Sequence, residues 1–123
     1  MSPSQEAYFT QVDGRYRLAL VALDPAAPGE IIAVVRYEGV PGSDRAEYAA
    51  LVTDRWQGRG LGTALTQELI EAARQNGVRA LWASVLPQNL RMLNLLRDLH
   101  FPEVTRYSDG VAEIEIDISS TEP

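Results

Sequence analysis

Residues 55–64 read RWQGRGLGTA and join two segments of different hydrophobic pattern. An apolar, strand-like run lies before them at residues 48–53, and apolar residues with helical spacing follow at residues 61–76. A glycine-rich turn between a strand and a helix lets the backbone approach a ligand closely, and the N–H groups at the start of the helix favour an anion. The stretch therefore predicts a phosphate or pyrophosphate site that is made mostly of main chain.

Three strands are expected before this loop, at residues 15–23, 30–38 and 45–53. Each is rich in apolar and β-branched residues, and turn signals containing proline and glycine separate them. Because the connections are short, the three strands should pair as an antiparallel meander. Residues 4–11 are expected to form a short helix.

Two helices and three further strands are expected from the loop onward. A helix at residues 61–76 should lead to a strand at residues 78–86, and a crossover of this kind places that strand parallel to the third one. A second helix at residues 88–99 precedes two strands that meet at residues 108–110, and the last, at residues 111–118, alternates apolar and acidic side chains. The predicted fold is α+β, a mixed α/β sandwich with a central mixed sheet of about six strands and two main helices.

The composition is ordinary for a globular chain and excludes several chemistries. With 123 residues, the sequence is expected to form a single domain over residues 1–123, with a disordered tail at residues 119–123. The formal net charge of −6 argues against nucleic acid as a partner, because phosphate backbones select basic surfaces. The absence of cysteine and lysine excludes a thiolate metal site, an acyl-cysteine intermediate, Schiff-base chemistry and a Walker-type loop.

The N-terminal residues lack the charged-then-apolar pattern of a signal peptide, and no apolar run is long enough to span a bilayer. A cytoplasmic location is therefore expected, with no membrane partner. No metal is expected as a cofactor.

Residues 57–62, QGRGLG, match the pattern (Arg/Gln)-x-x-Gly-x-(Gly/Ala). Taken alone, these glycines could instead form a tight loop that merely starts a helix. Here, however, the glycines follow a strand and precede a helix, and a further strand and then Asn89 at the start of the next helix come after them. With this order of elements, residues 13–118 resemble the acetyl-CoA-binding core of the GNAT superfamily of N-acetyltransferases. Residues 45–52 and 85–89 look closest to the bacterial protein-lysine acetyltransferase domains of that superfamily. A dinucleotide-binding loop is excluded by the glycine spacing and by the preceding meander.

The resemblance implies acetyl-CoA as co-substrate. The loop main chain would bind its pyrophosphate, Leu51 and Val52 would align the pantetheine arm, and the Val52 N–H would polarise the thioester carbonyl. Asn89 matches a family residue that contacts the pantetheine arm, although it could also be the N-cap of the second helix, and both roles stay open. The residues assigned to the cofactor are Leu51, Val52, Gln57, Gly58, Arg59, Gly60, Leu61, Gly62, Thr63 and Asn89.

Glu47 is the expected general base, as the resemblance to the protein-acetyltransferase domains implies. An amine acceptor arrives protonated near neutral pH and must lose a proton before it attacks, and a carboxylate on the central strand could accept that proton. Burial would raise the pKa of the carboxyl and improve it as a base. The alternative is an ion pair between Glu47 and Arg45 or another arginine.

The sequence departs from the family pattern at three places. Leu96 stands where many members have a tyrosine that acts as general acid, and His100 replaces a glycine and is expected to be a helix-end residue. Ser84, Tyr48 and Tyr107 are candidate hydroxyl donors, and the sequence does not rank them. The family's strand and two helices before residue 13 are expected to be missing, so the acceptor side should be more open, completed by a partner subunit, or lost. An exposed edge left by the missing strand would support a homodimer.

These features predict an N-acetyltransferase that moves acetyl from acetyl-CoA directly to a primary amine, with a protein lysine as the expected acceptor. The alternative is a non-catalytic module that binds acyl-CoA or another protein.

Overall fold

The computed structural model describes residues 6–11 and 17–119. Seven strands and two helices make up these residues, with a short 3₁₀ turn at Asp54–Trp56 before the glycine loop. The elements are β1 (Glu6–Gln11), β2 (Arg17–Asp24), β3 (Ala27–Gly39), β4 (Arg45–Val52), α1 (Leu61–Gln75), β5 (Ala80–Val85), α2 (Leu90–Asp98), β6 (Glu103–Ser108) and β7 (Val111–Asp117).

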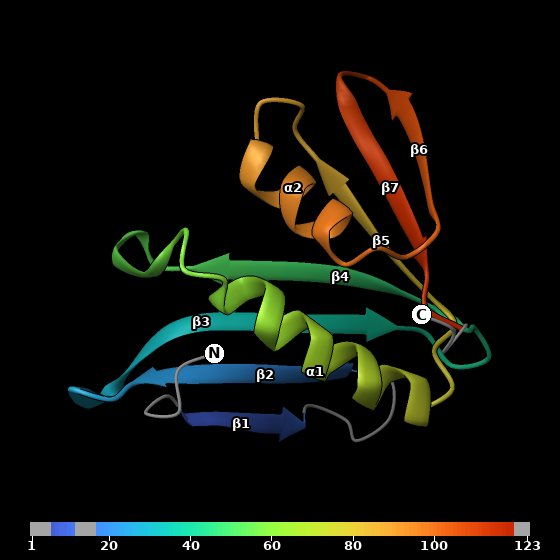
Figure 1. The fold of residues 1–123 in the computed structure, drawn as a ribbon. Helices are drawn as coiled ribbons and strands as arrows, with labels where there is room; N and C mark the ends of the chain where they lie inside the picture. The colour runs from blue at the N-terminus through green and yellow to red at the C-terminus, as the bar shows by residue number, and fades with distance from the viewer. Residues whose placement is uncertain (1–5, 12–16, 120–123) are drawn as a thin grey trace.

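The strands form one sheet in the order β1-β2-β3-β4-β5-β7-β6 (Figure 1). β2, β3 and β4 form the predicted antiparallel meander, and β4 and β5 are the predicted parallel pair. The α+β fold with a mixed sheet and two helices is thereby confirmed. The predicted disorder at residues 119–123 falls, apart from Ser119, outside the described residues.

The N-terminal segment corrects two expectations. Residues 6–11 form β1 and not a helix, because they pair with the edge of β2 along its length, and tertiary pairing outweighs the weak local preference of so short a segment. This strand raises the count from about six to seven. It also corrects the expectation that no strand lies in front of the meander, so the outer edge on this side belongs to β1. The homodimer stays a prediction.

Both helices lie on one face of the sheet, as Figure 1 shows. The apolar face of α1 is buried through Leu65, Leu69 and Ile70, and the inner end of α2 is buried through Leu96 and Leu99. The helices and the inward-facing strand residues form one hydrophobic core. The opposite face, called here the helix-free face, is not covered by any helix of the described chain.

The parallel pair β4–β5 is joined at one end only. Residues 45–47 of β4 pair with residues 80–82 of β5, and beyond this point the strands diverge (Figure 1). β4 remains paired with β3 as far as Val52. One edge of β4 is therefore left open toward β5 over its C-terminal half.

Candidate functional site

A groove of about 470 Å³ lies at the wide end of the β4–β5 gap, between the start of α1 and the exposed side of α2. All residues assigned to the cofactor from the sequence line it except Arg59. The sequence did not identify the contributions of Trp56 and of α2, which faces the groove with Arg91, Met92, Asn94, Leu95 and Asp98. Helical spacing of these α2 residues was the only available signal, and it does not say which exposed face meets a cavity.

The glycine loop, residues 57–62, places the start of α1 beside this groove. Gly58 and Gly60 have φ angles of 78° and 77°, in the left-handed region that favours glycine. Gly60 is the N-cap, no side chain caps the helix, and the first intrahelical bond runs from the Ala64 N–H to the Gly60 carbonyl. The N–H groups of residues 61–63 therefore have no acceptor within the helix and can bind an anion.

Two side-chain contacts hold the loop. The amide Nε2 of Gln57 donates to the Val52 carbonyl at 2.8 Å, which ties the loop to the end of β4. The guanidinium of Arg59 lies over the Trp56 ring, 4.8 Å from its centroid. Arg59, which does not line the groove, thus supports an aromatic side chain that does.

Close packing at Gly62 sets the floor of the groove. A Cβ at this position would lie 3.0 Å from Cδ1 of Leu95 and 3.4 Å from Cγ2 of Val52. The first turn of α1, α2 and β4 therefore meet at a point where only glycine fits without a shift of its neighbours.

The free edge of β4 offers main-chain groups to the groove. The N–H of Thr53 donates to the Ile32 carbonyl of β3 at 2.9 Å. Because successive N–H groups of a strand point to opposite edges, those of Ala50 and Val52 point toward the gap, and that of Leu51 points to β3. The contact of Leu51 and Val52 with a ligand stays a prediction, and the N–H directions show that the Val52 and Ala50 amides, not the Leu51 amide, face the gap.

Glu47 lies at the narrow end of the same gap, on the helix-free face. It is exposed, and it stands opposite Glu38 of β3 and Trp82 of β5. The alternative of an ion pair with Arg45 is wrong, because Nε of Arg45 donates to Oε1 of Glu115 at 2.8 Å. Glu47 forms no ion pair with any described residue, so its carboxylate is free to accept a proton from solvent-exposed groups.

Asn89 is the N-cap of α2, since its Oδ1 accepts a hydrogen bond from the Met92 N–H at 3.2 Å. It also lines the groove. The capping role is therefore confirmed, and the contact with a ligand stays a prediction.

The other predicted proton donors lie elsewhere. Tyr48 is buried, its hydroxyl is 2.6 Å from Oγ1 of Thr66, and burial raises its pKa above the ordinary value. Leu96 is buried in the core, and His100 follows α2 with a φ of 61°, which confirms it as a helix-end residue. Ser84 and Tyr107 are exposed but line neither the groove nor the second cavity described next.

A second cavity, of about 520 Å³, lies on the helix-free face above β5, β7 and β6. It is lined by Arg45, Trp82, Val104, Arg106, Glu113, Ile114 and Glu115. No sequence pattern indicated this cavity, because these residues come from four strands whose neighbours are known only once the sheet order is known. Trp82, opposite Glu47, joins this cavity to the narrow end of the gap.

Residues 6–11 and 17–119 contain neither a candidate metal-binding cluster nor a helix that could span a membrane. No three His, Asp or Glu side chains are grouped so that they could hold a metal ion. None of the helices described here is long and apolar enough to cross a bilayer.

The model of the acetyltransferase (GNAT) family matches residues 2–101. The L-methionine sulfoximine/L-methionine sulfone acetyltransferase of Pseudomonas aeruginosa is 36% identical over 88 residues, which are 67% of this chain and 49% of that protein. The chain thus spans about half the length of this curated relative.

Two solved structures share the fold. The GNAT domain of S. lividans PAT has a TM-score of 0.77 and 35% identity, with 88% of this chain and 64% of that chain covered. A cAMP-binding acyltransferase from Mycobacterium smegmatis has a TM-score of 0.74 and 30% identity, with 87% of this chain and 33% of that chain covered.

Proposed function

Because this chain belongs to the GNAT family of acetyltransferases, we propose that it transfers an acetyl group from acetyl-CoA to a primary amine. The observation that carries the proposal is the uncapped start of α1, which opens into a groove beside an unpaired strand edge. A phosphate-bearing ligand with an extended arm suits both features.

The groove residues fit the donor. The N–H groups of residues 61–63 and the glycine loop would bind the pyrophosphate, and the main chain of Ala50 and Val52 would bind the extended arm as an added strand. When bound, acetyl-CoA supplies the activated acyl group. The Val52 N–H, which points into the gap, is the donor available to the acyl carbonyl oxygen.

On the amine side, Glu47 takes the proton. An ammonium with a pKa near 10 must be deprotonated before its nitrogen can attack, and an exposed, unpaired carboxylate can accept that proton directly or through one water. The chain has no cysteine, so the amine nitrogen would attack the acyl carbon itself. The C–N bond would form as the C–S bond breaks, and CoA would leave as a thiolate that takes its proton from solvent. Orientation of the two substrates would supply much of the acceleration.

Two acceptor classes are supported by different observations. Glu47 lies on an open face and not in an enclosed pocket, which suits the ammonium of a lysine on a protein surface. The Pseudomonas relative is named for methionine derivatives, which favours the amine of a free amino acid as the second candidate. We propose protein lysine as the acceptor and the free amino acid as its rival.

The test combines binding and turnover. Calorimetry should show that acetyl-CoA binds the wild type, and turnover should be found with a lysine-rich protein, with L-methionine sulfone as the comparison. Glu47→Gln should lower kcat by about 10²-fold and leave the Kd for acetyl-CoA unchanged, because the carboxylate acts on the amine. Absence of binding would refute the proposal, whereas binding with no turnover on any amine would favour the non-catalytic module. A wild-type rate in Glu47→Gln would remove only the base assignment.

A further inference from the structure

The two halves of the sheet are joined by a narrow hinge. β5 pairs with β7 over residues 80–85 and 112–117, whereas β4 pairs with β5 over residues 45–47 alone. One half therefore comprises β1 to β4 with α1, and the other comprises β5, β7 and β6 with α2. The groove between the start of α1 and α2, called here the donor groove after its proposed use, is lined by residues of both halves. Its width therefore depends on the angle at this hinge.

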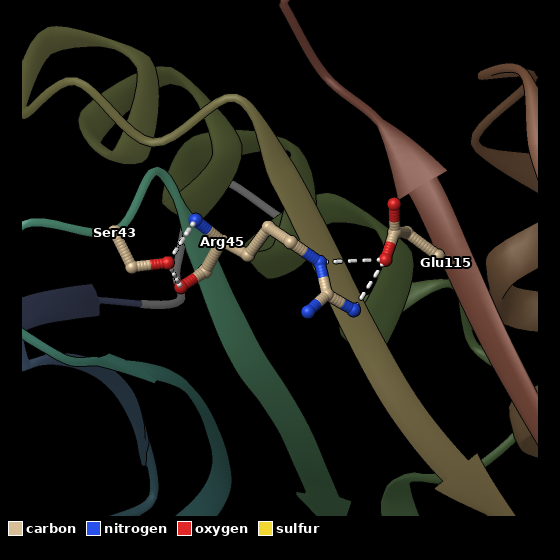
Figure 2. A network of polar contacts seen from close by, with 3 residues as sticks. All are labelled: Ser43, Arg45 and Glu115. Atoms are coloured by element: carbon tan, nitrogen blue, oxygen red, sulfur yellow. Dashed lines mark hydrogen bonds and ion pairs between the residues drawn. The ribbon is translucent and has the colours of Figure 1, made fainter.

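On the helix-free face, one side chain crosses the hinge. Arg45, the first residue of β4, reaches over β5 and donates through Nε and Nη2 to Oε1 of Glu115 on β7 (Figure 2). The two residues are 70 positions apart in the chain and lie on strands that are not neighbours. The start of β4 is itself fixed, since Oγ of Ser43 accepts the Arg45 N–H at 3.1 Å.

On the helix-covered face, a second arginine crosses in the same direction. Nε of Arg74, in the last turn of α1, donates to the Ile118 carbonyl just beyond β7 at 2.6 Å. Its guanidinium also lies 5.3 Å from the centroid of the Phe101 ring, between α2 and β6. An arginine of the first half thus holds the second half on each face of the sheet.

We propose that Arg45 and Glu115 are a positioning pair that sets the opening between β4 and β5, and through it the width of the donor groove. The inference rests on the proposed use of this groove for acetyl-CoA. Only three residue pairs join β4 to β5. The angle between the halves therefore depends also on contacts outside the strand pairing, namely the shared core and the arginine contacts on each face. A small rotation at the hinge is amplified at the wide end, where the donor arm would have to lie within hydrogen-bond distance of Val52. The pair is half-exposed, so its effect is on geometry more than on stability.

The first test measures acetyl-CoA binding by calorimetry, without turnover. Arg45→Gln and Glu115→Gln should each raise the Kd about threefold to fivefold, which corresponds to the loss of one well-formed exposed pair. The double exchange Arg45→Glu with Glu115→Arg should return the Kd to within about twofold of the wild type.

Arg36→Gln is the matched control. Arg36 lies on the same face, its side chain is 56% exposed against 52% for Arg45, and its partner Glu38 lies within the same strand at 3.5 Å. The control removes an equal charge without touching the hinge, so it should leave the Kd unchanged. If Arg36→Gln and Arg45→Gln weaken binding equally, Arg45 acts only through its charge. If the double exchange does not restore the Kd, the pairing of residues 45 and 115 does not set the groove. Either result overturns the inference.

The second test measures the opening directly in the absence of acetyl-CoA. The chain has no cysteine, so spin labels can be placed by Leu51→Cys and Leu86→Cys at the wide ends of β4 and β5, where these side chains are 71% and 54% exposed. Adding Arg45→Gln should lengthen or broaden the distance distribution, whereas Arg36→Gln should not. Identical distributions would overturn the inference. Failure of the wild type to bind acetyl-CoA would instead remove the proposed function and leave this measurement valid.

Discussion

At the scale of single residues, burial prevents Tyr48 from acting as a proton donor to a ligand. Its hydroxyl is bonded to Thr66 in the core and burial raises its pKa, so it stays protonated and out of reach of a ligand. Tyr48→Phe should therefore keep the wild-type kcat and its pH profile. It should lower the free energy of unfolding by about 1 kcal/mol, because Oγ1 of Thr66 loses its buried partner. A large fall in kcat with an intact fold would restore Tyr48 as a proton donor.

The same residue gives a pH dependence with a definite sign. A tyrosine whose pKa is raised in the folded state contributes stability that is complete below the unfolded pKa of about 10. That contribution is lost as the pH rises from there toward the folded pKa. Chemical denaturation from pH 9 to 11 should therefore show the stability difference between the wild type and Tyr48→Phe shrinking above pH 10. A constant difference would mean that Tyr48 is not desolvated.

Residue spacing predicted which residues line the groove beside α1, but it did not say whether Glu47 is buried or exposed. The glycines, Gln57 and Asn89 are close in sequence to the elements that they join, so local pattern was enough to place them beside a helix start. The partner of Arg45 is 70 positions away, and it can be found only when β7 is known to lie beside β5. The exposure of Glu47 depends in the same way on which face the helices cover.

At the scale of elements, α2 combines two roles at its first turn. Asn89 caps the helix and also lines the groove. Asn89→Ala should lower the free energy of unfolding by about 1 kcal/mol, whereas Asn89→Ser keeps an N-cap oxygen and should cost at most a few tenths. Both variants lack the amide, so both should raise the Kd for acetyl-CoA if Asn89 contacts it. Thermal unfolding and calorimetry on the same samples separate the roles. If Asn89→Ser binds acetyl-CoA with the wild-type Kd, Asn89 acts only as the N-cap of α2.

The strongly periodic elements were predictable and the weakly patterned one was not. The apolar face of α1 and the alternation of β7 each fix a type of structure and a buried side, and both are found. Residues 6–11 are short and lack either period, so the available edge of β2 decided their conformation. Local propensity is too small to compete with a full row of strand pairing.

At the scale of the whole molecule, the sheet separates two surfaces of different chemistry. One face carries the helices, the loop and the donor groove, and the other carries Glu47 and the second cavity. The gap where β4 diverges from β5 is the opening in the sheet between the two surfaces. Such an arrangement suits a transfer reaction in which two substrates approach from opposite sides of a sheet and meet at the opening.

The two tryptophans report on these surfaces separately. Trp56 lines the donor groove beneath Arg59, whereas Trp82 lines the cavity on the helix-free face. Acetyl-CoA should therefore change the fluorescence of the wild type and of Trp82→Phe, but not that of Trp56→Phe. An acceptor amine added alone should change the fluorescence of the wild type and of Trp56→Phe, but not that of Trp82→Phe. Calorimetry on each variant checks that binding itself survives the substitution. If the response to acetyl-CoA persists in Trp56→Phe and disappears in Trp82→Phe, the donor binds on the helix-free face and the assignment of the two surfaces must be reversed.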